Sequence, residues 1–162
     1  MKIITVLAAI LTVFASTASA ADFVLGLGYA DFNNDASEDN PAVALEVHGD
    51  PFRSFGKIDV SLVGALTAHS NGDAYVGVGV SALRDFDNKW FLEGSFMPGL
   101  YDPASSANDL GSTLEFRTLF GVGRRIGEGS RLSLAFDHKS NASTGDINPG
   151  VNTLMLRFRR SF

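Results

Sequence analysis

The stretch that decides the fold runs from residue 132 to residue 141. It reads Leu132-Ser133-Leu134-Ala135-Phe136-Asp137-His138-Lys139-Ser140-Asn141. At the two-residue period of a β-strand, the even positions share one face, which is apolar as far as Phe136 and then carries His138 and Ser140. The odd face is small or polar. An apolar face points to the core in a soluble protein and to lipid in a membrane barrel, so the fold depends on which solvent this face meets.

Alternation of the same kind recurs along the chain and predicts eight strands. They cover residues 23–32, 43–48, 57–66, 75–82, 90–97, 114–123, 132–141 and 153–162. The second strand is expected to end at the turn residues Gly49-Asp50-Pro51. Longer polar loops alternate with shorter turns, as in outer-membrane barrels whose two termini lie in the periplasm. An even number of strands lets the sheet close without leaving edges.

We therefore predict an all-β fold, an eight-stranded antiparallel transmembrane β-barrel with apolar residues outside and polar residues inside. Glycines and small residues opposite the apolar rows suit the narrow lumen of a small barrel. Charged residues on the polar faces are expected to form ion pairs in that lumen, because buried charges need partners. These residues are Glu46, Lys57, Asp59, Glu115, Arg117, Arg157 and Arg159. Alternation alone leaves open a secreted soluble barrel of lipocalin type, with its apolar rows facing inward.

The first 20 residues have the features of a secretory signal peptide. Lys2 is followed by an apolar run over residues 3–14 and by the small residues Ala18-Ser19-Ala20 before the expected cleavage point. The barrel domain is then expected to cover residues 21–162. No later stretch has roughly 18 uninterrupted apolar residues, so no helical anchor is expected. The chain has no cysteine, which excludes a disulfide framework.

The composition of the chain limits the kinds of partner and cofactor that we expect. The formal net charge of −5 becomes −6 without Lys2, and no basic cluster is present, which argues against a nucleic-acid partner. The 17 glycines and 13 phenylalanines, with only 5 prolines, favour a barrel. No residue spacing resembles a metal site, and no glycine pattern between a strand and a helix forms a nucleotide loop, so neither a metal nor a cofactor is expected.

His138 and Ser140 are the candidate chemical groups. A histidine two residues before a serine on a strand can bring an acceptor nitrogen near a hydroxyl, which is the geometry of an activated serine nucleophile. If this strand rises from a periplasmic turn at residues 127–129, both side chains lie at its outer end on the lipid side. Groups placed there reach only molecules of the external leaflet. We therefore expect lipopolysaccharide as the partner and the outer membrane as the location.

The motif Phe136-x-His138-x-Ser140-Asn141 resembles that of the lipid A 3-O-deacylase (PagL) family, which consists of eight-stranded outer-membrane esterases. Residues 110–116 and 121–123 are similar to the preceding strand of that family, so the resemblance covers about the C-terminal third of the chain. It implies hydrolysis of the 3-O-linked hydroxyacyl chain of lipid A at a serine hydrolase site on the barrel exterior.

The same resemblance assigns roles to the motif residues. Ser140 is the expected nucleophile and His138 the expected general base, and an oxyanion donor is expected from the region of Asn141. The family has an acidic residue on its last strand, and the matching position here is Asn152. An asparagine can orient a histidine but cannot stabilise the imidazolium by charge, and Asp146 in the preceding loop is a possible substitute.

Other polar residues fit structural roles better. His69 is expected in a polar turn with Ser70 and Asn71, His48 is expected to be structural, and Asp137 has the parity of the lumen face. Since many small barrels have no enzymatic role, the alternative function is a non-catalytic outer-membrane barrel that acts in structure or adhesion through its loops.

Overall fold

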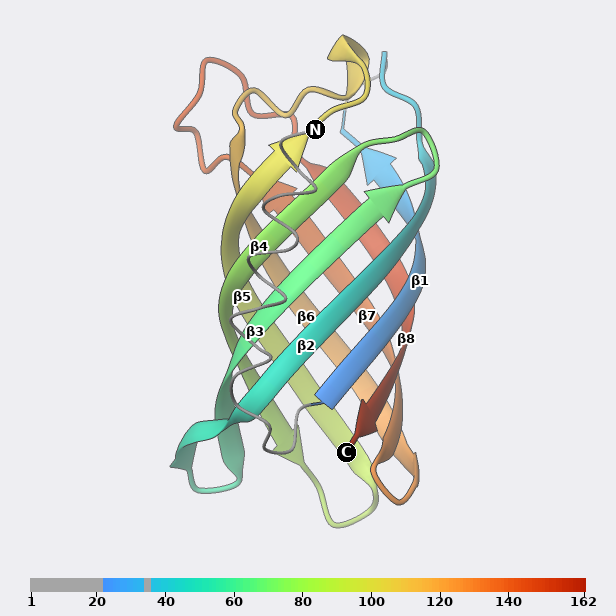
Figure 1. Cartoon of the computed structure of the whole chain (residues 1–162), viewed down its shortest axis with the longest axis vertical. Helices are drawn as coiled ribbons and strands as arrows, with labels where there is room; N and C mark the ends of the chain where they lie inside the picture. The colour runs from blue at the N-terminus through green and yellow to red at the C-terminus, as the bar shows by residue number, and fades with distance from the viewer. Residues whose placement is uncertain (1–21, 34–35) are drawn as a thin grey trace.

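The computed structural model describes residues 22–33 and 36–162. The expected signal peptide, residues 1–20, lies outside the described residues. The strands are β1 (Asp22–Phe32), β2 (Asn40–Phe55), β3 (Ile58–His69), β4 (Ala74–Asp85), β5 (Trp90–Asp102), β6 (Leu114–Gly127), β7 (Ser130–Ser140) and β8 (Val151–Ser161). Each strand pairs antiparallel with its neighbours, and β1 pairs with β8 to close the barrel (Figure 1). The predicted eight-stranded β-barrel is confirmed.

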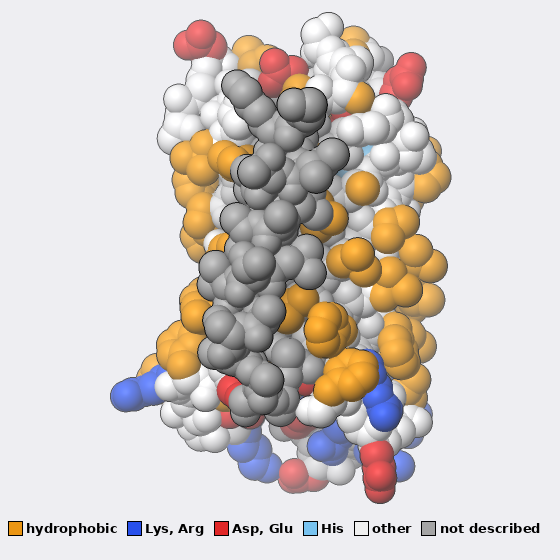
Figure 2. Space-filling model, viewed as in Figure 1, with side chains coloured by type: hydrophobic (Ala, Val, Ile, Leu, Met, Phe, Trp, Pro, Cys, Tyr) orange, Lys and Arg blue, Asp and Glu red, His pale blue; other side chains and the backbone are white. Residues whose placement is uncertain are grey.

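The two faces of the strands differ as the alternation predicts. Along β7, Leu132, Leu134 and Phe136 are exposed, whereas Ser133 and Ala135 are buried. The other strands repeat this arrangement, and Figure 2 shows an apolar belt around the middle of the visible face. Apolar side chains therefore face outward, as a barrel embedded in lipid requires.

The barrel has two unlike ends. One end, which we call the loop end, carries the segments 33–39, 70–73, 103–113 and 141–150, the third of which contains the short 3₁₀ helix η1 (Ser106–Asn108). The other end, the turn end, carries the short segments 56–57, 86–89 and 128–129 together with the C-terminus (Figure 1). Lysine and arginine side chains gather at the turn end of the face in Figure 2. No helix within the described ranges is long and apolar enough to cross a membrane.

Strand β2 corrects the prediction that the second strand ends at residues 49–51. It continues to Phe55, and its pairing with β3 shifts register on both sides of Pro51. A proline has no N–H to donate to the sheet, but a bulge accommodates it. The turn comes only at Gly56, whose φ of +62° suits a residue without a Cβ. As a result the β2–β3 hairpin extends the wall of the barrel at the turn end.

The lumen is held together by ion pairs that link distant strands. Glu46 on β2 accepts from Arg117 on β6 at 2.7 Å and also pairs with Arg157 on β8, which in turn reaches Glu93 on β5. Arg159 pairs with Asp22 at 2.6 Å, which ties β8 to β1. The predicted pairing in the lumen is confirmed for Glu46, Arg117, Arg157 and Arg159.

Three of the residues expected to form these pairs behave differently. Lys57 pairs with Asp87 between two exposed turns, and Asp59 is exposed on the extended hairpin and accepts from Ser54. Lys57 lies beyond the lumen because β2 continues to Phe55, whereas Asp59 lines a polar cavity at the turn end and has no ion-pair partner among the described residues. Glu115 does point into the lumen and is fully buried, but its carboxylate has no hydrogen-bond partner among the described residues.

Candidate active site on the outer surface of the barrel

His138 and Ser140 occupy the last outward-facing positions of β7, at the loop end of the barrel. They continue the row of Phe136, and both are partly exposed, whereas Asp137 and Lys139 between them are buried. Two residues of one strand that share a face lie about 7 Å apart along the backbone. The strand therefore presents an imidazole and a hydroxyl side by side on the surface that faces lipid.

Asn152 on β8 is the partner of His138. The two residues lie directly opposite each other in the register of β7 and β8, and Nδ1 of His138 lies 2.8 Å from Oδ1 of Asn152. An amide oxygen can only accept, so this contact places the proton on Nδ1 and leaves Nε2 as the acceptor nitrogen. Nε2 of His138 and Oγ of Ser140 form no hydrogen bond within the described part of the chain. The hydrogen bond with Asn152 orients the imidazole of His138.

The end of the loop between β7 and β8 lies close to the imidazole of His138. Gly150 has a φ of +71°, and a Cβ at this position would lie 2.9 Å from Cε1 of His138. The absence of a side chain thus lets the end of the loop pack against the ring. On the opposite side, β6 places Thr118 across from His138 and Phe116 across from Ser140. Phe116 stacks on Phe96 with ring centroids 5.9 Å apart, which makes an apolar wall next to the serine.

Asn141 anchors the loop that follows β7. Its buried amide Nδ2 donates to the backbone oxygens of Leu110 at 2.9 Å and Ile147 at 2.7 Å. Its backbone N–H donates to Oδ1 of Asn148 at 3.0 Å. The side chain of Asn141 is thus engaged in holding the loop in place. Asp146 is exposed, and the structure gives the position beside His138 to Asn152 rather than to this loop carboxylate.

Beyond Asn152 the polar row continues onto β1. Asp31 lies directly opposite Asn152 in the register of β1 and β8, and it is exposed on the outward face that Tyr29 also occupies. The amide Nδ2 of Asn152 donates to Oδ1 of Asn33 over 3.3 Å. Sequence reasoning missed Asp31 and Gly150. Asp31 carried a signal, since it ends an apolar row in the same way as His138 does.

The remaining histidines and Asp137 lie inside the barrel. Asp137 pairs with Lys139 at 2.7 Å, as its parity predicts. His48 is buried between Ser81 and Glu46 at 3.0 Å from each, which confirms its structural role. His69, expected in a polar turn, is the last residue of β3 and is buried beside Phe32. The turn comes one residue later, because β3 extends further than predicted.

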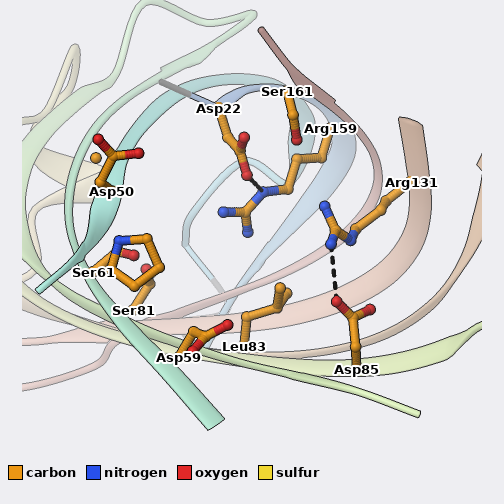
Figure 3. Close-up of a pocket in the computed structure, with 12 residues that line it drawn as sticks. Asp22, Asp50, Asp59, Ser61, Ser81, Leu83, Asp85, Arg131, Arg159 and Ser161 are labelled. Atoms are coloured by element: carbon orange, nitrogen blue, oxygen red, sulfur yellow. Dashed lines mark hydrogen bonds and ion pairs between the residues drawn. The ribbon is translucent and has the colours of Figure 1, made fainter. Parts of the chain in front are cut away.

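A polar cavity of about 200 Å³ opens at the turn end of the lumen (Figure 3), whereas His138 lies at the loop end of the barrel. Two of its four aspartates are paired, Asp22 with Arg159 and Asp85 with Arg131 at 2.9 Å, whereas Asp50 and Asp59 form no ion pair among the described residues. Within the described residues, no group of three or more acidic, histidine or cysteine side chains is placed to hold a metal ion. The cavity lining includes Ser81, whose Oγ lies 3.0 Å from Nδ1 of His48, and Nε2 of His48 lies 3.0 Å from Glu46 inside the lumen.

The fold and the surface cluster together define an eight-stranded barrel with an apolar outer face that carries His138, Ser140 and Asn152 at its loop end. The sequence profile of the family described as lipid A 3-O-deacylase (PagL) matches residues 15–161. The chain belongs to this family, which consists of ester hydrolases. Membership excludes the soluble lipocalin-type barrel.

Solved structures agree on the fold. The crystal structure of the outer membrane enzyme PagL is similar to 86% of this chain and 98% of its own, with 17% identity and a TM-score of 0.74. A de novo designed transmembrane β-barrel covers 88% of this chain and 95% of its own, with 7% identity and a TM-score of 0.60. The crystal structure of Ail, the attachment invasion locus protein of Yersinia pestis, covers 88% and 98%, with 13% identity and a TM-score of 0.57. No curated protein sequence matches the chain.

Proposed function

We propose that this protein is an outer-membrane lipid A 3-O-deacylase that works through Ser140 and His138. The observation that carries the assignment is the hydrogen bond of 2.8 Å from His138 to Asn152, on the lipid-facing side of a barrel of this family. It orients the imidazole through Nδ1 and leaves Nε2 as the acceptor nitrogen, and Ser140 is the next outward-facing residue of the same strand. Location in the outer membrane follows from the family and from the apolar belt.

The chemistry requires few groups. Nε2 of His138 removes the proton of Ser140 as Oγ bonds to the ester carbonyl carbon of the acyl chain. The same proton then passes to the 3-oxygen of the sugar, which leaves as an alcohol and frees an acyl-enzyme. Water deprotonated by His138 attacks the acyl-enzyme and releases the hydroxy fatty acid. During both steps Asn152 keeps the ring oriented through Nδ1.

The oxyanion donor is proposed to be the backbone N–H of Asn141, which follows the nucleophile directly. This N–H donates at present to the side chain of Asn148, an exposed residue. An oxyanion can replace that acceptor at little cost, because the displaced amide can be solvated by water. The buried amide of Asn141 stays bound to the loop and keeps the N–H in position.

The location of the site also explains how the substrate is reached. The ester of a lipid A molecule lies near the headgroup level, and its acyl chains extend into the apolar belt. Phe116 and Phe96 form an apolar surface beside Ser140 along which a chain can lie. An exterior site therefore acts on a lipid without removing it from the membrane.

Mass spectrometry of lipid A from cells that express the protein tests this proposal. We expect loss of one hydroxyacyl chain with the wild-type protein and no loss with Ser140→Ala. Ser130→Ala is the matched control, since Ser130 lies on the same strand and face but at the turn end. Intact lipid A in cells with a folded wild-type barrel would contradict the proposal and favour a non-catalytic role in structure or adhesion.

A further inference from the structure

We propose that Asp31 is a positioning residue that supplies the carboxylate missing from the position of Asn152. This inference rests on the proposed function and extends it to a residue on the first strand. The chain places the negative charge one strand further from the histidine, so that His138, Asn152 and Asp31 form a row across β7, β8 and β1.

The sheet register carries the argument. Asn152 is directly opposite His138 on one side and directly opposite Asp31 on the other. Residues opposite each other in an antiparallel pair have Cβ atoms about 5 Å apart and point to the same face. The carboxylate of Asp31 therefore emerges next to the amide of Asn152, on the outward surface that also carries the imidazole.

The hydrogen bonds of Asn152 leave room for this role. Its Oδ1 is occupied by His138, whereas its Nδ2 donates to Asn33 over 3.3 Å, which is long for such a bond. Asp31 itself forms no hydrogen bond or ion pair within the described part of the chain. A carboxylate is a stronger acceptor than a neutral amide oxygen. When the imidazole gains a proton, the amide of Asn152 is expected to turn its N–H groups toward Asp31.

The charges around the histidine make Asp31 stand out. On β6 the outward neighbours are Thr118, Phe116 and Phe120, none of which ionises. The charged residues Arg117, Asp137 and Lys139 near this level all point into the lumen and pair there. On the outside, the described carboxylates at this end include Asp31 on β1, Asp146 in the exposed loop and Asp39, whose Oδ1 accepts from the backbone N–H of Phe32 at 3.0 Å. Only Asp31 lies in register with Asn152.

The physical role is to stabilise the imidazolium that forms with the transition state. An asparagine orients the ring but carries no charge, and a carboxylate behind it adds a favourable interaction in poorly screening surroundings. This effect acts on the chemical step, so it changes kcat and leaves KM nearly constant.

The test measures release of hydroxy fatty acid from lipopolysaccharide in mixed detergent micelles by the purified, folded protein. Asp31→Asn is expected to lower kcat about tenfold, which corresponds to one charge-assisted hydrogen bond. Asp31→Glu keeps the charge and is expected to retain most of the activity. Asp102→Asn is the matched control, because Asp102 is an exposed, outward-facing carboxylate at the loop end of β5, across the barrel.

A second background separates positioning from a structural effect. In Asn152→Glu the carboxylate stands next to His138 itself, so Asp31→Asn should then change kcat by less than about twofold. A structural role of Asp31 would produce the same loss in both backgrounds. If Asp31→Asn does not fold, Asp31→Ser removes the same charge and the same comparison applies.

The outcomes distinguish this inference from the proposed function. If the wild type is inactive, or if Ser140→Ala remains active, the proposed function fails and this inference fails with it. If the wild type is active, Ser140→Ala is inactive and Asp31→Asn behaves like Asp102→Asn, only the role of Asp31 is overturned.

Discussion

Strand β7 carries two pairs of polar residues that alternate over positions 137–140 and differ in burial and in their hydrogen-bond partners. Asp137 and Lys139 point inward and are completely buried, and Asp137 pairs with both Lys139 and Arg117. His138 and Ser140 point outward and are partly exposed. His138 forms a side-chain hydrogen bond with Asn152.

In the proposed mechanism, one strand therefore supplies a stabilising pair on its inner face and the catalytic groups on its outer face. Inside the lumen each charge is surrounded by partners, because an unpaired buried charge is costly. Outside, a free acceptor nitrogen and a free hydroxyl are tolerated because they lie at the end of the apolar belt, near water and headgroups. The pleat of the strand is therefore sufficient to separate a structural network from a reactive one.

The largest expected effect comes from replacing two serines of β7 that lie on opposite faces of the strand. Ser140→Ala should lower ester hydrolysis by about 10⁴-fold or more, since the covalent route needs the hydroxyl, and should leave folding unchanged. Ser133→Ala should retain activity but lose about 1 kcal/mol of stability, because its hydroxyl donates to Glu93 at 2.7 Å inside the lumen.

Kinetics together with heat-induced shifts in gel mobility would measure both serine variants. Equal loss of activity in the two variants would show that the two faces are not separate.

A second effect concerns the centre of the inner network. Glu46→Gln should destabilise the barrel by about 3 kcal/mol, because it leaves Arg117 and Arg157 without a buried carboxylate that both contact. Denaturant titration in detergent would measure the change. The site lies on the other face, so the kcat of the folded variant should stay close to that of the wild type. A fall in kcat without a fall in stability would contradict the separation.

The third effect sharpens the role of the orienting residue. Asn152→Ala should lower kcat by about 10²-fold, because the imidazole loses the partner of Nδ1, whereas Asn152→Glu should preserve or raise kcat by adding charge. Asp146→Ala is the control and should be silent. If Asn152→Ala is silent and Asp146→Ala is severely impaired, the loop carboxylate completes the site instead.

The sequence predicts the fold well because a barrel wall is a regular pattern of period two. The sequence alone predicts which face of the strand Leu134 and Phe136 occupy, and it predicts the same face for His138. Strand ends are harder to predict. A proline usually ends a strand, but Pro51 is accommodated at a bulge within β2. The length of the hairpin then decides whether Lys57 is in the lumen or outside it.

The site could be predicted only along single strands. His138 and Ser140 are two residues apart, and the motif resemblance adds Asn152, whose contact with His138 the register confirms. Asp31 is more than a hundred residues away, and its place beside Asn152 follows from closure of β1 on β8. The sequence contains the parity of Asp31 but not the register that gives it a neighbour.

The smallest expected effect tests the loop support of the histidine with two glycines of similar backbone conformation. Gly150 and Gly56 have φ values of +71° and +62°, so an alanine strains both by about 1 kcal/mol. A Cβ at Gly150 would lie 2.9 Å from the ring of His138, whereas nothing lies within 4 Å of a Cβ at Gly56.

Gly150→Ala should therefore lower kcat about fivefold, because a ring displaced by a few tenths of an ångström holds its acceptor nitrogen less well toward Ser140. Gly56→Ala should cost similar stability and leave kcat unchanged. Steady-state kinetics and thermal stability of both variants would separate the contact from the strain. An equal change of kcat in the two variants would show that backbone strain, rather than support of the imidazole, determines the effect.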